Sequence, residues 1–229
     1  YEGIKSSEIL KNLKKNVLLK SRSSFNEVLL DKDKKRIQKF LKDSGYYFSK
    51  INISLEEFKD NKINLTYNIS LGEKAKIKKI SFIGEKIFKD KKLKGVILSE
   101  EYKPWKFLSG KKYLNEAIIN YDERLLKNFY LNKGYYNVEI TDAYSSIIDK
   151  ENFILTFNIN AGEKFNFGKF KLILPSDFDR KKFSKLDKLF NDLENTKYNI
   201  NQIENILDEI DRIALLENYE FINAQVSES

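Results

Sequence analysis

The side chains that this sequence lacks limit the chemistry it can perform. Its 229 residues include no His and no Cys. The chain therefore lacks the commonest general base and metal ligand, and it can form neither thiolate metal sites nor disulfides. It also has no Gly-rich phosphate loop and no G-x-S-x-G nucleophile elbow. A paired-carboxylate site stays open among 34 acidic residues, but charge of this kind is usually surface. We therefore expect no enzyme, no cofactor and no metal site.

The net charge of +8 raises the question of nucleic-acid binding. The charge is uneven: residues 164–229 contain 10 basic and 12 acidic residues, whereas the rest of the chain contains 32 and 22. Nearly all basic residues are Lys, and Arg occurs only at positions 22, 36, 124, 180 and 212. Base readout and bidentate phosphate binding favour Arg. Solvated helix faces and strand edges explain this charge better, and a basic nucleic-acid-binding module stays the weaker alternative.

Two stretches of the chain are nearly the same phrase, and they indicate the elements that organise it. "YNISLGEKAKI" begins at Tyr67 and "FNINAGEKFNF" begins at Phe157. Residues 63–71 alternate strictly between apolar and polar, and the apolar residues of 153–161 alternate in the same way around Ile154, Thr156, Asn158 and Asn160. This pattern predicts strands with one face on a core. Each phrase passes through Gly-Glu-Lys, and a second strand pattern follows almost at once.

A second motif recurs at the same distance along the chain. Gly45 and Gly134, each followed by two tyrosines, lie 89 residues apart, and Gly72 and Gly162 lie 90 apart. A near-constant offset across two motifs indicates duplicated domains. A third, weaker copy, "LLENYEFINAQV", has Asn218 in place of the glycine. Gly and Asn both tolerate the left-handed backbone that closes a helix.

Helical periodicity precedes each of these positions. Apolar residues recur at spacings of four, three, four and four in the middle copy, at Leu114, Ile118, Tyr121, Leu125 and Phe129. Shorter helices are expected near 6–16, 89–98 and 176–192, and first hairpin strands near 46–55 and 135–144. Each unit thus runs strand, helix, helix and two-stranded hairpin, an α+β arrangement.

A tandem β-α-α-β-β unit with these motifs resembles the POTRA domains of the Omp85 superfamily. The Gly-Tyr at the helix end, the Gly-Glu at the hairpin end and the following strand with Ile77, Ile80, Phe82 and Gly84 carry the resemblance. It implies three domains, each a three-stranded mixed sheet covered by two helices. They are most like the second to fourth POTRA domains of outer-membrane β-barrel assembly factors. The expected boundaries are 1–74 with a truncated first strand, 75–163, and 164–229 without its last strand.

The resemblance also implies a location and partners. It predicts a periplasmic segment that precedes a membrane β-barrel in the same chain, receives unfolded outer-membrane proteins and docks accessory assembly lipoproteins, without nucleic acid. Other Omp85-type transporters (two-partner secretion, TamA-like or chloroplast-type import channels) remain alternatives. A sheet of this kind leaves an edge strand whose N–H and C=O groups can pair with an extended client by β-augmentation.

The run from Tyr135 to Tyr144 is chosen as the client-binding edge. It contains Glu139 and Asp142 but no Lys, the usual protection of a strand edge. The proposed edge residues are Tyr136, Asn137, Val138, Glu139, Ile140 and Thr141. One of each tyrosine pair is expected to pack in the core and the other to be exposed.

Two further sets of residues are assigned from the sequence. Trp105 and Phe107 form a candidate partner loop, although Trp105 is expected to pack between the helices rather than to anchor a partner. A structural role in turns and helix ends is expected for the glycines of the repeated motifs, Gly45, Gly72, Gly84, Gly134 and Gly162.

Overall fold

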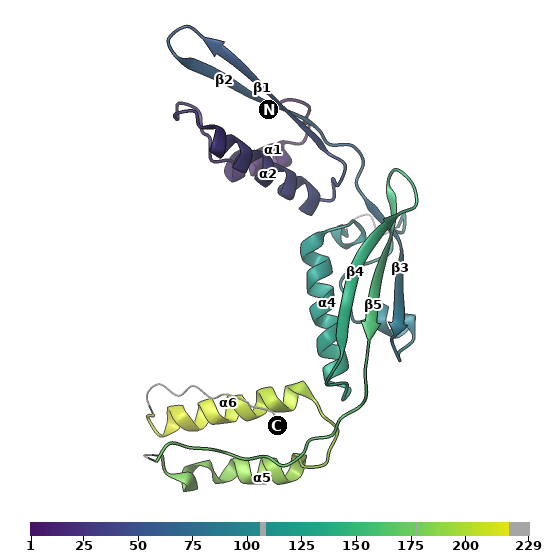
Figure 1. Cartoon of the computed structure of the whole chain (residues 1–229), viewed down its shortest axis with the longest axis vertical. Helices are drawn as coiled ribbons and strands as arrows, with labels where there is room; N and C mark the ends of the chain where they lie inside the picture. The colour runs from purple at the N-terminus through teal and green to yellow at the C-terminus, as the bar shows by residue number, and fades with distance from the viewer. Residues whose placement is uncertain (106–108, 177, 220–229) are drawn as a thin grey trace. The chain divides into compact units, whose positions relative to one another are not determined.

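A computed structural model of the chain describes residues 1–105, 109–176 and 178–219. It contains two compact units, one of residues 1–83, 88–123 and 142–157 and the other of residues 84–87, 124–141 and 158–229. Helices and strands follow one another as the α+β repeat predicts (Figure 1). The division between the units falls inside the second repeat, so the three domain boundaries expected from the sequence stay a prediction.

The first repeat places two helices beside a long hairpin. Helices α1 (Ser7–Asn16) and α2 (Glu27–Asp43) start at the side-chain caps Ser6 and Asn26, and strands β1 (Lys50–Phe58) and β2 (Lys62–Ser70) pair antiparallel. The core consists of buried apolar side chains from both layers, Leu13, Val17, Ile37, Leu41, Tyr67 and Ile69. The segment before α1 completes the sheet, because Glu2 exchanges backbone hydrogen bonds with Tyr67 and Ile69. Strand β2 is therefore central and β1 lies at an edge.

The second repeat has a three-stranded sheet in the order β3-β5-β4. Its elements are β3 (Lys76–Glu85), α3 (Asp90–Lys94), the 3₁₀ turn η1 (Gly110–Lys112), α4 (Glu116–Leu131), β4 (Glu139–Ile147) and β5 (Asn152–Asn160). The alternate residues of β5 are buried, as period two requires, at Phe153, Leu155, Phe157 and Ile159. Phe157 stacks on Phe82 of β3 with ring centroids 5.6 Å apart. Because β4 is the last strand in the order β3-β5-β4, this first hairpin strand of the repeat lies at an edge of the sheet.

The third repeat contains the turn η2 (Arg180–Phe183) and two helices, α5 (Ser184–Leu193) and α6 (Ile200–Leu216). Phe183, Leu186 and Ile213 form its core. Residues 169–174 keep the alternation of a strand, since Leu172 and Leu174 pack on this core while Ile173 is 77% exposed. Within the described residues this segment is not assigned as a strand.

Both first hairpin strands begin four residues later than the sequence pattern predicts. Gly134, with φ of +92°, closes α4 in the left-handed conformation, and the Tyr135 N–H bonds back to the Tyr130 carbonyl. The chain then makes a further turn, in which the Val138 N–H bonds to the Tyr135 carbonyl at 3.3 Å. Tyr136, Asn137 and Val138 therefore precede the edge strand instead of forming its start.

Two shorter helices also differ from their expected bounds. Helix α3 ends at Lys94, well before residue 98, because Gly95 follows it and bonds to the last turn. Helix α5 begins at Ser184 and not near 176, because the 3₁₀ turn η2 occupies the residues before it. The hairpin-closing strands agree with their expected spans to within one residue.

Candidate functional site

Strand β4 offers an open edge in the second repeat. The Ile148 N–H bonds to the Asn152 carbonyl at 2.8 Å where the hairpin begins. In an antiparallel ladder alternate residues face the partner strand, so Ser146 and Tyr144 bond toward β5 while the N–H groups of Ser145 and Ala143 point outward. Among the described residues, no other backbone group bonds to this outer side. An extended chain can therefore add here.

The opposite edge of the same sheet is already covered. The Tyr102 N–H bonds to the Ile77 carbonyl at 2.7 Å, and a carboxylate oxygen of Glu101 accepts the Ile80 N–H at 3.0 Å. The Leu114 N–H bonds to the Ala75 carbonyl at 2.9 Å just before β3. These contacts use backbone groups in and just before the first half of β3, so an added strand cannot pair along the whole of this edge, which we call closed.

Charge distinguishes the two edges as well. Strand β3 carries Lys76, Lys78 and Lys79, whereas β4 carries no Lys and has two carboxylates, Glu139 and Asp142. Lys on an edge strand is a common protection against unwanted pairing. The edge without Lys is thus the one whose backbone groups are unused among the described residues.

The burial pattern of β4 divides the strand in two. Ile140 and Ala143 are both half-buried, and Thr141 and Asp142 between them are both exposed. The alternation thus slips by one residue, as it does at a β-bulge. The regular part of the edge, from Ala143 onward, is therefore the part best suited to pairing.

Asp142 also affects a neighbouring carboxylate. Burial and the charge of Asp142 raise the pKa of Glu123 on α4.

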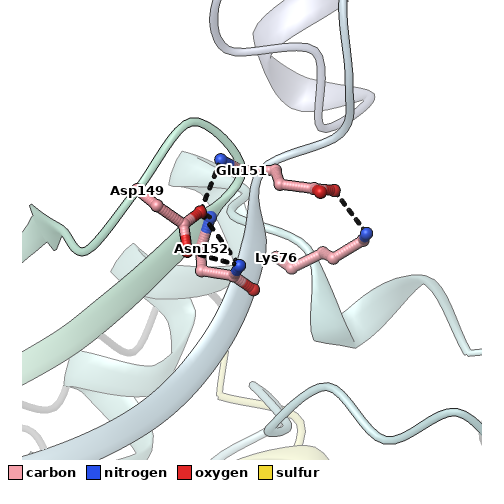
Figure 2. Close-up of polar contacts among 4 residues, drawn as sticks. All are labelled: Lys76, Asp149, Glu151 and Asn152. Carbon is pink, nitrogen blue, oxygen red and sulfur yellow. Dashed lines mark hydrogen bonds and ion pairs between the residues drawn. The ribbon is translucent and has the colours of Figure 1, made fainter.

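Asp149 organises the turn between β4 and β5 (Figure 2). Its carboxylate accepts the N–H groups of Glu151 and Asn152 at 3.1 and 3.0 Å and also the Asn152 side-chain amide. These hydrogen bonds, led by that from the Glu151 N–H, lower the pKa of Asp149. Glu151 in turn forms an ion pair with Lys76 at the start of β3, and their hydrogen bond raises the pKa of that lysine. The turn thus holds the end of the open edge in a defined position.

The segments joining successive repeats are built in the same way. The Ala75 N–H bonds to the Gly45 carbonyl at 2.8 Å, and the Phe165 N–H bonds to the Gly134 carbonyl at 2.8 Å. The Ala75 carbonyl accepts the Leu114 N–H, and the Phe165 carbonyl accepts the N–H of Tyr198 at 3.0 Å. One residue in each joint is therefore held on both sides by backbone hydrogen bonds.

The side chains around the two joints differ. At the first joint the Lys74 ammonium lies over the rings of Tyr46 and Tyr113, at 5.2 and 4.9 Å from their centroids. At the second, Tyr136 packs edge-on against the rings of Phe165 and Tyr198. Tyr136, which was expected to belong to the client edge, is thus a joint residue, because the extra turn before β4 directs it there.

Two buried aspartates tie the helices together, and the sequence patterns above do not identify them. Asp33 accepts the N–H groups of Leu18 and Leu19 at 2.6 and 2.9 Å, and it also accepts the Tyr67 hydroxyl at 3.3 Å. Asp122 accepts the N–H groups of Leu98 and Ser99. Both aspartates are fully buried. The signal was available, because a single acidic residue interrupts the apolar face of each helix.

The structure also describes most of the other residues singled out in the sequence, which are the candidate partner loop, the second tyrosine pair and the motif glycines. Trp105 is 71% exposed and lies near the Lys103 ammonium, so its expected packing between the helices is wrong. Pro104 and the turn around it direct the ring outward. Phe107 lies outside the described residues. Tyr135 is buried and Tyr136 is 37% exposed. Positive φ angles occur at all five motif glycines, Gly45, Gly72, Gly84, Gly134 and Gly162.

The described residues contain no cluster of three acidic side chains that could hold a metal ion. None of the helices in that part of the chain has the length and apolarity needed to cross a bilayer.

Comparison with known proteins identifies relatives for most of the chain. The POTRA family, described as surface antigen variable number repeat, matches residues 3–72 and 75–162. The outer membrane protein assembly factor BamA of Buchnera aphidicola is 27% identical over 222 residues, which cover 96% of this chain and 35% of that protein. BamA of Neisseria meningitidis is 24% identical over 208 residues, 90% of this chain and 26% of the relative. The chain thus spans about a third or less of the length of these relatives.

A solved structure shows the same fold. The crystal structure of Haemophilus influenzae BamA POTRA3-5 superposes with a TM-score of 0.53 at 17% sequence identity. The match covers 92% of this chain and 82% of that one.

Proposed function

This chain belongs to the POTRA family, and we propose that it forms part of the periplasmic segment of an outer-membrane β-barrel assembly factor. The names of its relatives support the assembly role, and the two matched repeats support the type of segment. In this role the segment precedes a membrane β-barrel of the same protein and performs no catalysis.

The substrates of the segment are unfolded outer-membrane proteins, which add to the edge of β4 by β-augmentation. One observation carries this assignment: among the described residues, β4 is the edge of its sheet whose outward N–H and C=O groups are unused. Backbone pairing is insensitive to client sequence, which suits a protein that receives many clients. The apolar side chains of Tyr144, Ile147 and Ile148 are 48%, 63% and 50% exposed beside this edge. They provide contacts for alternate residues of an added strand.

The burial pattern of β4 supports a position for this proposed site. The pairing segment centres on Ala143–Ile147, beyond the slip in alternation, and Glu139, Ile140 and Thr141 flank it. Asn137 and Val138 precede the strand and take no part in pairing. Accessory assembly lipoproteins are further proposed partners, and the exposed ring of Trp105 is a contact point of the kind that such partners use.

The test is titration of the 229-residue chain with an extended peptide from an outer-membrane β-strand, followed by NMR shift changes of backbone amides. Shifts are expected along 143–147 and not along β3. Ser145→Pro removes an outward N–H at an edge, where proline is tolerated, and should weaken binding several-fold. Ser145→Ala keeps that N–H and should bind as the parent does. Unshifted β4 amides, or equal binding by a folded Ser145→Pro protein, would overturn the site.

A further inference from the structure

The helical layer of the first repeat is strongly basic. Residues 5–42 contain 12 basic and only 4 acidic residues. One of the four, Asp33, is fully buried and bonded to backbone N–H groups, so it contributes no exposed carboxylate. Another, Asp31, is paired with Lys35 at 2.7 Å. The exposed charge of this layer is therefore mainly positive, with Glu8, Glu27 and Asp31 as its exposed carboxylates.

The basic side chains project from both helices. On α1, Leu13 faces the core, and a helical period of 3.6 places Lys11 and Lys15 on the opposite side. On α2, Ile37 is buried and Lys32 and Lys39 lie away from it. Lysines and arginines at the ends of α1 and along α2 are exposed as well, at Lys14, Lys20, Arg22, Lys34 and Arg36. Together these residues form what we call the basic layer.

Most of the basic layer has no carboxylate partner. Lys39 lies 3.9 Å from Asp43, and Lys35 pairs with Asp31. Within the described part of the chain, no carboxylate lies within ion-pair distance of Lys11, Lys15 or Lys32. The Lys20 ammonium and the Arg36 guanidinium donate to the carbonyls of Lys14 and Asn16, which gathers positive charge at the end of α1.

The excess of positive charge is largest in the first repeat and falls along the chain. The corresponding helical segment of the second repeat, residues 86–133, has 12 basic but 6 acidic residues. In the third repeat, residues 178–219 have 7 basic and 9 acidic residues. The same helical layer thus changes sign along one chain, although its fold is repeated.

We propose that the basic layer binds the surface of an anionic phospholipid bilayer. The charges are spread over two helices instead of converging on a cleft, which fits a broad, flat array of phosphates. Ten of the twelve basic residues in 5–42 are Lys, a point charge that needs no fixed bidentate geometry, whereas nucleic-acid recognition favours Arg. The proposal rests on the periplasmic location assigned above, because that location puts the segment beside a membrane.

The test measures sedimentation of the 229-residue chain with two kinds of vesicle. One is phosphatidylcholine alone, and the other contains about a third phosphatidylglycerol. Binding is expected only to the anionic vesicles, and it should fall steeply between low and roughly physiological salt because exposed charges are screened. Each near-surface lysine is worth about fivefold in partitioning. The Lys11→Gln, Lys15→Gln, Lys32→Gln and Lys34→Gln combination should therefore weaken binding by at least tenfold.

A matched control removes the same number of charges elsewhere. Lys78, Lys79, Lys169 and Lys171 are exposed and outside the basic layer, and their replacement by Gln gives the same net charge. This variant should bind anionic vesicles nearly as well as the parent. Equal losses in the two variants, or binding to acidic polypeptides without binding to vesicles, would overturn the proposal. Client-peptide shifts on β4 are measured on the same samples, so loss of vesicle binding with intact peptide binding is distinguishable from failure of the proposed function.

Discussion

Asp33 and Asp122 lie 89 residues apart and make the same contact in successive repeats. Each is a buried carboxylate on the second helix of its repeat, and each accepts two backbone N–H groups that follow the first helix. The spacing equals that between Gly45 and Gly134. Aligned through Asn218, the third repeat has Ile206 at this position, and that side chain is also buried. The third repeat thus replaces a polar tie between its helices with apolar packing.

Removing the Asp122 carboxylate should destabilise the second repeat strongly. Asp122→Ala leaves the Leu98 and Ser99 N–H groups without their acceptor, at a cost of about 1–3 kcal/mol for each unsatisfied buried group. Asp122→Asn keeps one acceptor oxygen and should cost less. The measurement is urea unfolding at neutral pH, with the exposed Asp142→Asn as the control. A loss below about 0.5 kcal/mol for Asp122→Ala would show that water replaces the carboxylate.

The first repeat should lose stability in alkaline solution. Burial and the charge of Asp33 raise the pKa of Tyr1 to about 12, and the same causes raise the pKa of Tyr67 further. Between pH 10 and the raised values the folded chain holds protons that the unfolded chain has released. Stability is therefore full below pH 10 and falls as the pH rises through this window. The pKa values of Tyr47, Tyr113 and Tyr198 are raised as well, so absorbance of tyrosinate should show several late-ionising groups, and Tyr1 and Tyr67 should be those that titrate together with unfolding of the first repeat. Tyr67→Phe should reduce the slope, and an unchanged slope would contradict the assignment.

The repeated strands, helices and closing glycines could be predicted from the sequence because short-range patterns determine them. Period-two alternation located β5 to within one residue, and the 89-residue offset identified the equivalent positions. The start of β4 could not be predicted, because the turn at Tyr135 depends on how Gly134 closes α4. The exposure of Trp105 could not be predicted either, since an aromatic residue beside a proline fits both a core and a surface loop.

The open and closed edges of the sheet also lie beyond sequence patterns. Which edge is covered depends on the long-range contacts of Glu101 and Tyr102 with β3, and no local pattern reports them. The absence of Lys singles out β4, whose outer backbone groups are unused among the described residues, but it does not show which part of the strand is regular. Client binding at this edge stays a prediction.

Two glycines with similar φ angles should differ in their tolerance of alanine. At Gly72, φ is +68° and a Cβ would meet nothing within 4 Å, so Gly72→Ala should cost about 1–2 kcal/mol from the left-handed backbone alone. At Gly84, φ is +80° and a Cβ would lie 2.4 Å from the Ile159 carbonyl oxygen. The backbone of β5 must then move, and Gly84→Ala should cost roughly twice as much or more. Thermal unfolding of the two variants measures the difference, and equal losses would mean that the sheet adjusts freely.

Trp105 is the only tryptophan of the chain, so its fluorescence reports its environment directly. An indole that is 71% exposed should emit at nearly the same wavelength in the native and the urea-unfolded chain and should be quenched readily by acrylamide. Trp105→Ala should change the free energy of unfolding by less than about 0.5 kcal/mol, because surface substitutions away from packed groups have small effects. The buried Tyr130, replaced by Ala, is the contrast and should cost several kcal/mol. A blue-shifted native emission, or a Trp105→Ala loss close to that of Tyr130→Ala, would return Trp105 to a packing role and remove it as a contact point for accessory lipoproteins. If emission and stability agree with exposure, loss of lipoprotein binding in Trp105→Ala can be assigned to the contact itself.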